Sequence, residues 1–231
     1  MGLYAISDLH LAFGVDKPMG IFGENWVEHH LRIKENWIKK ITEDDTVIIG
    51  GDISWGMSKE EGFKDLEWLN LLPGNKILIR GNHDYWWSGI KKLNSLYDNM
   101  MFLQNNFFPY GEYAICGTRG WICPGGYNFK EDKDRKIFNR ECIRAELSLK
   151  AAKEAGYNKI IFVTHYPPFN EKIEQNEFMD LFKVYEVEKV IYGHLHGAGR
   201  KNAFEGQYEG IEFKLTSADH IDFNPVKIVG S

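Results

Sequence analysis

Five short polar clusters in this 231-residue chain each follow a run of aliphatic residues. They consist largely of histidine, aspartate and asparagine, residue types that bind metals or move protons. If each aliphatic run is a buried strand, the clusters lie at the carboxyl ends of strands, where α/β sheets bind ligands. We therefore expect the clusters to converge although they are far apart in sequence. The clusters read SDLH (Asp8, His10), GGDIS (Asp52), GNHD (Asn82, His83, Asp84), THYPP (His165) and GHLH (His194, His196).

These residue types fit a site for divalent cations. Two cations ~3.5–4 Å apart need a carboxylate between them, while imidazole and oxygen ligands complete each shell and leave positions for water and substrate. Asp8 and His10 are two positions apart, which places both side chains on one side of an extended strand end, and His194 and His196 share that spacing. One such motif is common by chance, but the ordered set is not. Glycine permits close backbone approach and precedes the candidate ligands at Gly50, Gly51, Gly81 and Gly193.

The elements that must position these clusters alternate between strands and helices, which predicts an α/β fold with strands covered on both faces. Residues 25–41 carry apolar residues on one helical stripe, and Asn25 with Glu28 resembles a capping box. Ser58 and Glu61 repeat that signal before a second helix. A longer helix is expected over 137–155, and it should end at Gly156. The expected buried strands are 3–7, 46–51, 76–81, 159–165 and 189–194.

Two segments differ from this alternation. Residues 111–129 are rich in glycine and aromatic residues and are predicted to form a strand followed by a long loop. Residues 204–223 alternate in the manner of antiparallel edge strands. Aromatic candidates for a pocket wall are Trp86, Trp87, Trp121 and Tyr127, and the alternative is that they fill the core, as aromatic residues more often do.

Composition restricts the class of protein. The length fits one domain over 1–231, and 43% hydrophobic residues are enough to fill a core. A net charge of −5, without a basic stripe, argues against a dedicated nucleic-acid binder. Three cysteines without a C-x-x-C pair suit reduced thiols, and no apolar run approaches the ~18 residues of a membrane span. We expect a cytoplasmic protein without membrane attachment. The oligomeric state stays open.

The ordered motifs D-x-H, G-D, G-N-H-D, H and G-H-x-H, from Asp8 to His196, resemble those of the calcineurin-like metallophosphoesterase family. The resemblance implies two packed mixed β-sheets flanked by helices. It also implies two transition-metal ions, Mn²⁺ or Fe²⁺ as first choices and Zn²⁺ or Ni²⁺ as alternatives. Asp52 resembles the bridging ligand of that pair. The other implied ligands are Asp8, His10 and His196 for one metal and Asn82, His165 and His194 for the second.

The resemblance also implies catalytic roles. A metal-bound hydroxide would attack phosphorus, His83 would face the leaving-group oxygen, and Asp84 would orient the His83 ring. Arg80 precedes G-N-H-D, where some relatives have an arginine that binds phosphate, and a surface ion pair is the alternative role. Arg119 is a weaker candidate. Many relatives have an aspartate, and the iron-tyrosinate phosphatases a tyrosine, where this chain has Trp55, so no phenolate is available there.

Three functions are compatible with the sequence. The leading one is hydrolysis of a small-molecule phosphoester, either a monoester or a diester. A scaffold that keeps the fold without catalysis is the second, although such proteins typically lose ligands and this chain retains all of them. A nuclease is the third, and the net charge of −5 disfavours it. The physiological substrate depends on the shapes of the 13–25 and 111–130 loops, which the sequence does not fix.

Overall fold

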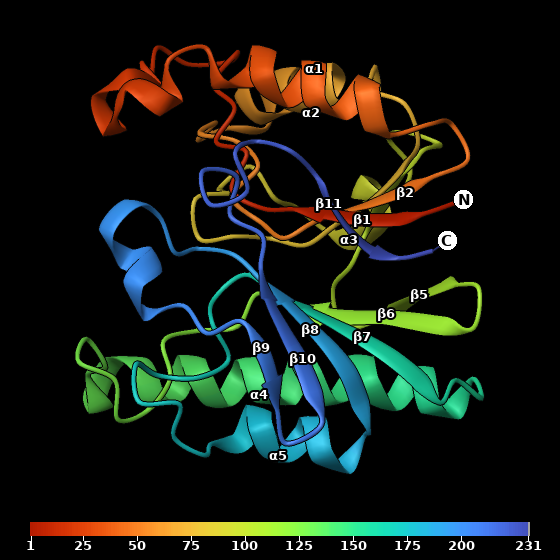
Figure 1. Ribbon diagram of the computed structural model, residues 1–231, viewed down its shortest axis with the longest axis vertical. Coiled ribbons are helices and arrows are strands. Elements are labelled where there is room, and N and C mark those ends of the chain that lie inside the picture. The colour runs from red at the N-terminus through yellow and green to blue at the C-terminus, as the bar shows by residue number, and fades with distance from the viewer. Residues whose placement is uncertain (231) are drawn as a thin grey trace.

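The computed structural model describes residues 1–230 and contains two mixed β-sheets that pack face to face (Figure 1). The first sheet has the order β11–β1–β2–β3–β4, and β11 is its one antiparallel strand. The second has the order β5–β6–β7–β8–β10–β9, with antiparallel strands at both edges. The first-sheet strands are β1 (Leu3–Ile6), β2 (Thr46–Ile49), β3 (Asn75–Leu78), β4 (Met100–Phe102) and β11 (Val226–Val229). Those of the second are β5 (Phe107–Tyr110), β6 (Tyr113–Thr118), β7 (Lys159–Thr164), β8 (Val187–Tyr192), β9 (Gly206–Tyr208) and β10 (Ile211–Leu215).

Helices cover the outer face of each sheet, as the resemblance implies. In Figure 1, α1 and α2 lie over the first sheet, and α4 and α5 lie over the second. The α-helices are α1 (His29–Lys40), α2 (Lys59–Asn70), α3 (Ile90–Leu93), α4 (Glu131–Glu154) and α5 (Glu177–Val184). Three 3-10 helices are η1 (Met19–Phe22), η2 (Glu24–Trp26) and η3 (Gly197–Asn202).

The aliphatic strand sequences reflect burial on both faces. All four residues of β2 are buried, and successive side chains of a strand point to opposite faces. Val47 and Ile49 pack in the core under α1 and α2, whereas Ile48 packs between the two sheets. This two-sided burial fixes the strand register and therefore holds the strand ends, which carry the polar clusters, in place.

All three predicted helices are present, but two of them begin elsewhere than predicted. The capping box of Ser58 and Glu61 begins α2, and α4 ends before Gly156, whose φ is +89°, but begins at Glu131 rather than at 137. The capping box at Asn25 is wrong. Residues 24–26 form a 3-10 turn, and Glu28 has a φ of 49°, a left-handed conformation through which an α-helix cannot run, so α1 begins at His29.

The segment after η3 is only partly as predicted. The strands β9 and β10 form an antiparallel edge pair, as the alternation of 204–223 indicates. However, β10 also pairs in parallel with β8, which the sequence pattern does not reveal. The carboxyl end of β10 therefore lies at the same sheet edge as the carboxyl ends of β7 and β8. Among residues 1–230, no helix combines the length and apolarity needed to cross a membrane.

Candidate metal centre

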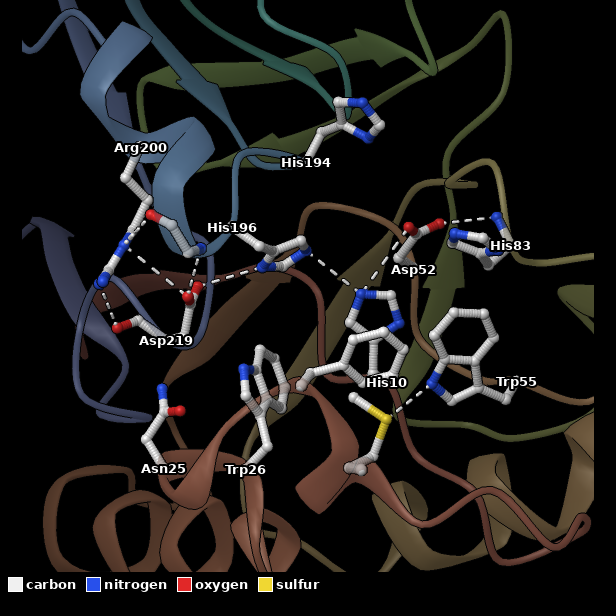
Figure 2. Close-up of a pocket in the computed structure, with 13 residues that line it drawn as sticks. His10, Asn25, Trp26, Asp52, Trp55, His83, His194, His196, Arg200 and Asp219 are labelled. Carbon is white, nitrogen blue, oxygen red and sulfur yellow. Dashed lines mark hydrogen bonds and ion pairs between the residues drawn. The ribbon is translucent and has the colours of Figure 1, made fainter.

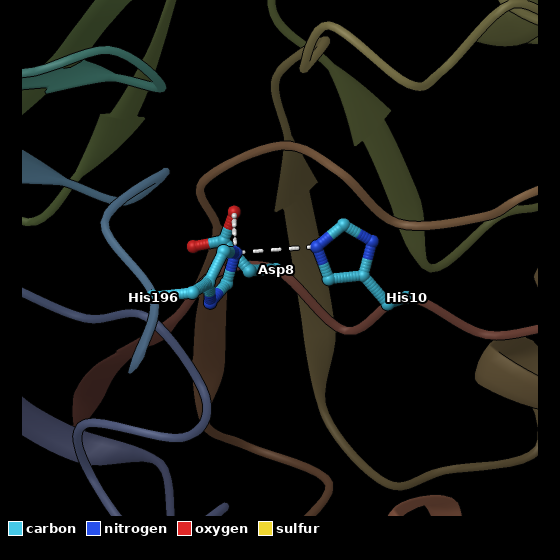
Figure 3. A group of neighbouring side chains, drawn as sticks. All are labelled: Asp8, His10 and His196. Atoms are coloured by element: carbon cyan, nitrogen blue, oxygen red, sulfur yellow. Dashed lines mark hydrogen bonds and ion pairs between the residues drawn. The ribbon is translucent and has the colours of Figure 1, made fainter. Parts of the chain in front are cut away.

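Asp8, His10 and His196 form the first of two groups of side chains that converge beyond the carboxyl ends of the strands (Figure 3). Asp8 and His10 follow β1, and His196 follows β8. The Nε2 atoms of His10 and His196 are 3.2 Å apart, and Oδ1 of Asp8 lies 3.3 Å from Nε2 of His196. Asp8 and His10 are buried, whereas the His196 side chain is 29% exposed. One side of the first group is thus accessible from outside.

Asp52, His165 and His194 form the second group. The Nε2 atom of His165 lies 3.4 Å from Oδ2 of Asp52 and 3.2 Å from Nδ1 of His194. The same nitrogen lies 2.9 Å from the side-chain oxygen of Asn82. The opposite ring nitrogen of His165 is 3.0 Å from the carbonyl of Gly50, an acceptor that fixes the tautomer and leaves Nε2 free for a ligand.

The separations within each group match ligands of a single cation. Two ligand atoms 2.0–2.1 Å from one cation are about 3–3.4 Å apart in octahedral or tetrahedral geometry. The distances of 3.2 and 3.3 Å in the first group and 2.9 to 3.4 Å in the second fall near this range. Oδ2 of Asp52 is 3.9 Å from Nε2 of His10 and 3.4 Å from Nε2 of His165, so the Asp52 carboxylate lies between the groups.

Unsatisfied buried atoms provide an independent test of whether cations fit. Oδ1 of Asp8 and Nδ1 of His10 are buried and have no hydrogen-bond partner among residues 1–230. A buried polar atom without a partner is costly, and Oδ1 of Asp8 faces its own group, where a cation would satisfy it. The donor set of imidazole, carboxylate and amide oxygen suits divalent transition metals. The residues present therefore fit the metal ions that the resemblance implies.

The pKa values of the histidines in the two groups also fit a metal-binding site. Burial lowers the pKa of His10 and that of His194 to about 3, so both rings are neutral at pH 7, as ligands must be. Burial also acts to lower the pKa of His165, but Asp52 and Asp8 outweigh it and raise that pKa to about 9. Asp8 and Asp219 likewise raise the pKa of His196 to about 10 against the effect of burial. Without a cation, the protons bound to His165 and His196 therefore balance the negative charge of the neighbouring carboxylates.

Backbone strain is concentrated at the candidate ligands. Four of them have positive φ, a conformation that costs of order 1–3 kcal/mol outside glycine: Asp8 at 60°, His10 at 46°, Asp52 at 49° and His194 at 70°. Close approach explains two of the glycines. A Cβ on Gly81 would lie 2.1 Å from Oδ1 of Asp52, and one on Gly193 would lie 2.6 Å from Oδ2 of Asp8. At these positions the backbone thus adopts strained conformations that bring the candidate ligands together, at a cost to folding stability.

His83 and Asp84 occupy different surroundings. The backbone N–H of His83 donates to Oδ1 of Asp52 at 2.8 Å, and the His83 imidazole lines the adjoining pocket without belonging to either group. Asp84 does not hold the His83 ring, which corrects the prediction. Its buried carboxylate instead accepts hydrogen bonds from the backbone N–H groups of Ile53, Ser54 and Gly81 and from the Trp86 indole. Asp84 therefore fixes the loops that carry Asp52 and Asn82.

Arg80 is not among the residues that line the pocket, so its phosphate-binding role stays a prediction. Its Nε donates to the carbonyl of Asp84 at 3.2 Å, and its other guanidinium nitrogens have no hydrogen-bond partner among residues 1–230. Arg119 lies 3.6 Å from the buried Glu141 carboxylate and over the Trp121 ring, which favours a structural role for it.

Sequence reasoning misses Asp219 and Arg200. Oδ1 of Asp219 lies 3.1 Å from Nδ1 of His196 and supplies the outer carboxylate support that the sequence lacks at Trp55. Arg200 donates to the carbonyls of Gly197 and Asp219 and lines the pocket. Asp219 follows the carboxyl end of β10, the same signal that identifies the other clusters. That signal is hidden because 204–223 looks like a purely antiparallel pair.

A pocket of about 440 Å³ opens beside the two groups (Figure 2). Its aromatic residues are Phe22, Trp26 and Trp55, and the predicted wall of Trp86, Trp87, Trp121 and Tyr127 is wrong. Trp86 and Trp87 are buried in the core under α1 and α2, and Tyr127 is 79% exposed. The Trp55 ring stacks on the His10 ring, with centroids 4.8 Å apart and planes inclined by 20°.

Comparisons with known proteins agree with this geometry. Residues 1–198 match the model of the calcineurin-like phosphoesterase family. A 78-residue stretch is 37% identical to the Gene 66 protein of Mycobacterium phage L5 and covers 34% of this chain and 37% of the phage protein. An uncharacterised protein of Methanocaldococcus jannaschii, MJ1445, is 28% identical over 127 residues, which cover 54% of this chain and 69% of that protein.

Solved structures share the fold at low sequence identity. The phosphopantetheinyl hydrolase of Mycobacterium tuberculosis superposes with a TM-score of 0.60 at 15% identity, covering 100% of this chain and 96% of its own. The TT1561 protein of Thermus thermophilus gives 0.57 at 14% identity, covering 98% and 97%. Because the family match spans most of the sequence and the motifs converge in space, the chain belongs to the calcineurin-like phosphoesterase family.

Proposed function

We propose that the two groups hold one divalent cation each, with Asp52 between them, and that the chain hydrolyses small-molecule phosphoesters at this centre. The convergence of the carboxylate and imidazole atoms into two sets, with distances of 3.2 to 3.4 Å, carries the proposal. Asn82 joins the second set through its side-chain oxygen, 2.9 Å from Nε2 of His165. Mn²⁺ and Fe²⁺ are the proposed ions, because mixed nitrogen and oxygen donors suit both.

Bound cations would supply positive charge for the phosphoryl oxygens and lower the pKa of water in the site. The chain's own residues orient the substrate and handle the leaving group. His83 lies in the pocket with its ring 5.8 Å from that of His10, outside both groups. Burial lowers the pKa of His83, so its ring is neutral near pH 7 and retains one N–H. That N–H can hydrogen-bond the leaving-group oxygen as negative charge develops on it.

We also propose that the protein works in the cytoplasm. Cys116, Cys123 and Cys142 are all free thiols, which fits a reducing compartment. Burial raises the pKa of Cys116 and that of Cys142 to about 12, so neither thiol is reactive at neutral pH.

His83→Asn, examined in manganese-loaded protein, tests the proposed function. The variant should keep its full metal content, because His83 belongs to neither group. We expect kcat to fall about 10²–10⁴-fold on alkyl phosphates, the range for loss of an acid–base residue, and less on p-nitrophenyl phosphate, whose leaving group needs little assistance. His30→Asn is the matched control, because His30 lies on α1 and is not among the residues that line the pocket. Loss of metal by His83→Asn, or undiminished turnover of an alkyl phosphate, would contradict the assignment.

A further inference from the structure

The pocket beside the metal centre has two unlike sides. Its volume of about 440 Å³ lies within the ~300–1,000 Å³ range of pockets that enclose a drug-sized organic ligand. Imidazoles and the Asp52 carboxylate line the side toward the two groups, Asn25, Arg200 and Asp219 line a second polar part, and the remaining side is apolar (Figure 2). A substrate whose phosphoryl group faces the cations must place its remaining atoms against the apolar side, which consists of Met19, Phe22, Trp26 and Trp55.

The rings on the apolar side can contact another ring, although one face of Trp55 is already stacked on His10. Phe22 and Trp55 are parallel to within 4°, with centroids 6.2 Å apart. The Trp55 N–H donates to Sδ of Met19, so it is already satisfied and Trp55 presents a ring rather than a polar atom. Aromatic rings prefer offset stacking or edge-to-face contact with a flat partner, which adds to the gain from area burial.

The distances from Trp55 to His83 and His10 determine how far a ring of the substrate can lie from its ester oxygen. The Trp55 centroid is 4.3 Å from that of His83 and 4.8 Å from that of His10. A ring packed here therefore lies directly beside the ester oxygen and not at the end of a long spacer. Nζ of Lys17 lies 4.2 Å from the Trp55 centroid and 5.6 Å from the Phe22 centroid, so this cation already contacts both rings.

We infer that the preferred substrates are phosphoesters whose leaving group carries a flat ring close to the ester oxygen, with the ring packed against Phe22, Trp26 and Trp55. This inference rests on the proposed function. It deepens that function, because it assigns the selectivity to the leaving group and to residues of the 19–26 segment and Trp55, none of which belongs to the two groups of candidate ligands.

Two pairs of ligands isolate the shape of the leaving group. Benzyl phosphate and cyclohexylmethyl phosphate have the same number of carbon atoms and leave as primary alcohols, but only the first carries a flat ring. Their phosphonate analogues, which are not hydrolysed, report binding alone. For manganese-loaded protein we expect a preference of about 2- to 10-fold for the benzyl member, in kcat/KM for the phosphates and in Kd for the phosphonates, measured by isothermal titration calorimetry.

Phe22→Ala should remove most of this preference in both measurements. Phe22 is 52% exposed, so the variant should fold, and Phe22→Trp should restore the preference. Ile21→Ala is the matched control, because Ile21 is 68% exposed in the same turn of η1 but does not line the pocket. It should leave the preference unchanged.

The outcomes separate this inference from the proposed function. Equal affinity for the two phosphonates, or a preference that survives in Phe22→Ala, would overturn the ring-binding site even in an active phosphoesterase. Failure of the loaded protein to hydrolyse any phosphoester would overturn the proposed function. The phosphonate titrations would still decide whether the pocket selects a flat ring.

Discussion

The two groups of candidate ligands are supported in different ways. In the first, Asp219, far along the chain, contacts His196, and the Trp55 ring stacks on His10. In the second, the hydrogen-bonding supports are backbone groups, and the Tyr166 ring packs on His194 with centroids 4.1 Å apart. The carbonyl of Gly50 lies 3.0 Å from Nδ1 of His165, and the backbone N–H of His83 donates to Asp52. Side-chain supports can be removed one at a time, whereas backbone supports belong to the strand ends themselves.

This difference predicts how each group tolerates mutation. Outer-shell partners typically contribute about 10–100-fold to metal affinity or activity. In the first group the backbone N–H of His194 donates to Oδ2 of Asp8, but the partner of the His196 ring is a single side chain, so the affinity of this group can change without disturbing the sheet. In the second group a comparable change requires a different backbone conformation. We therefore expect the cation of the first group to be the more easily tuned and the more easily lost.

Asp52→Asn should have the largest effect, because it acts on both groups at once. The substitution removes negative charge between the sites while it preserves the size of the side chain. We expect both cation affinities to fall by more than the ~10–100-fold typical of an outer-shell partner, and activity to fall with them. Elemental analysis after dialysis, together with turnover of p-nitrophenyl phosphate, measures both. A variant that retained one cation at full occupancy would show that Asp52 does not connect the groups.

Acidification should weaken both groups to a similar degree. His165 and His196 have pKa values raised to about 9 and about 10, so each ring carries a proton at pH 7 in the absence of cations. Each cation must displace that proton, so affinity should fall about tenfold per pH unit per group as the pH decreases below the raised pKa. Calorimetry in buffers of different ionisation enthalpy should detect about two protons released at pH 7. Release of none would contradict the protonated state of both rings.

Asp219→Asn should distinguish the groups. Loss of the carboxylate beside Nδ1 of His196 should weaken the first cation about 10–100-fold and leave the second nearly unchanged. Competition with a chelator, followed as two binding steps, measures each affinity. Asp222→Asn, on the same segment but exposed, is the control. Equal weakening of both steps by Asp219→Asn would show that the supports are not independent.

Much of the site and of the fold can be predicted from the sequence. The motifs at the ends of β1, β2, β3, β7 and β8 predict the convergence of all seven candidate ligands, because a parallel strand has one fixed carboxyl edge. Two sheets flanked by helices are confirmed as well. The extent of one domain over 1–231 stays a prediction.

Sequence reasoning fails where tertiary pairing or side-chain direction decides. The pairing of β10 with β8 brings Asp219 to the site, but the period-2 pattern of β10 does not identify its neighbour. Asp84 is adjacent to His83, yet its carboxylate turns toward backbone N–H groups of two loops. Likewise, Asn25 and Glu28 look like a capping box in the sequence, but Glu28 has a positive φ, so α1 begins only at His29.

Arg80 and Arg200 provide the last and smallest test. The terminal nitrogens of Arg80, two residues before the candidate ligand Asn82, have no hydrogen-bond partner among residues 1–230, whereas Nε and Nη1 of Arg200 donate to the carbonyls of Gly197 and Asp219. If Arg80 binds a phosphoryl oxygen, Arg80→Ala should cost about 1.5–3 kcal/mol, roughly 10- to 100-fold in kcat/KM. Arg80→Lys should recover only part of this, because lysine lacks the planar two-point contact.

Arg200→Ala should change kcat/KM only a few-fold, because breaking bonds to protein carbonyls does not remove a phosphate ligand. Inhibition by inorganic phosphate provides a second measurement, since it should weaken in Arg80→Ala and stay near its original strength in Arg200→Ala. The reverse order would place the phosphoryl oxygens on the side of the first group. Arg200 would then be the phosphate-binding residue, and Arg80 would serve to hold the carbonyl of Asp84 in the loop that carries Asn82.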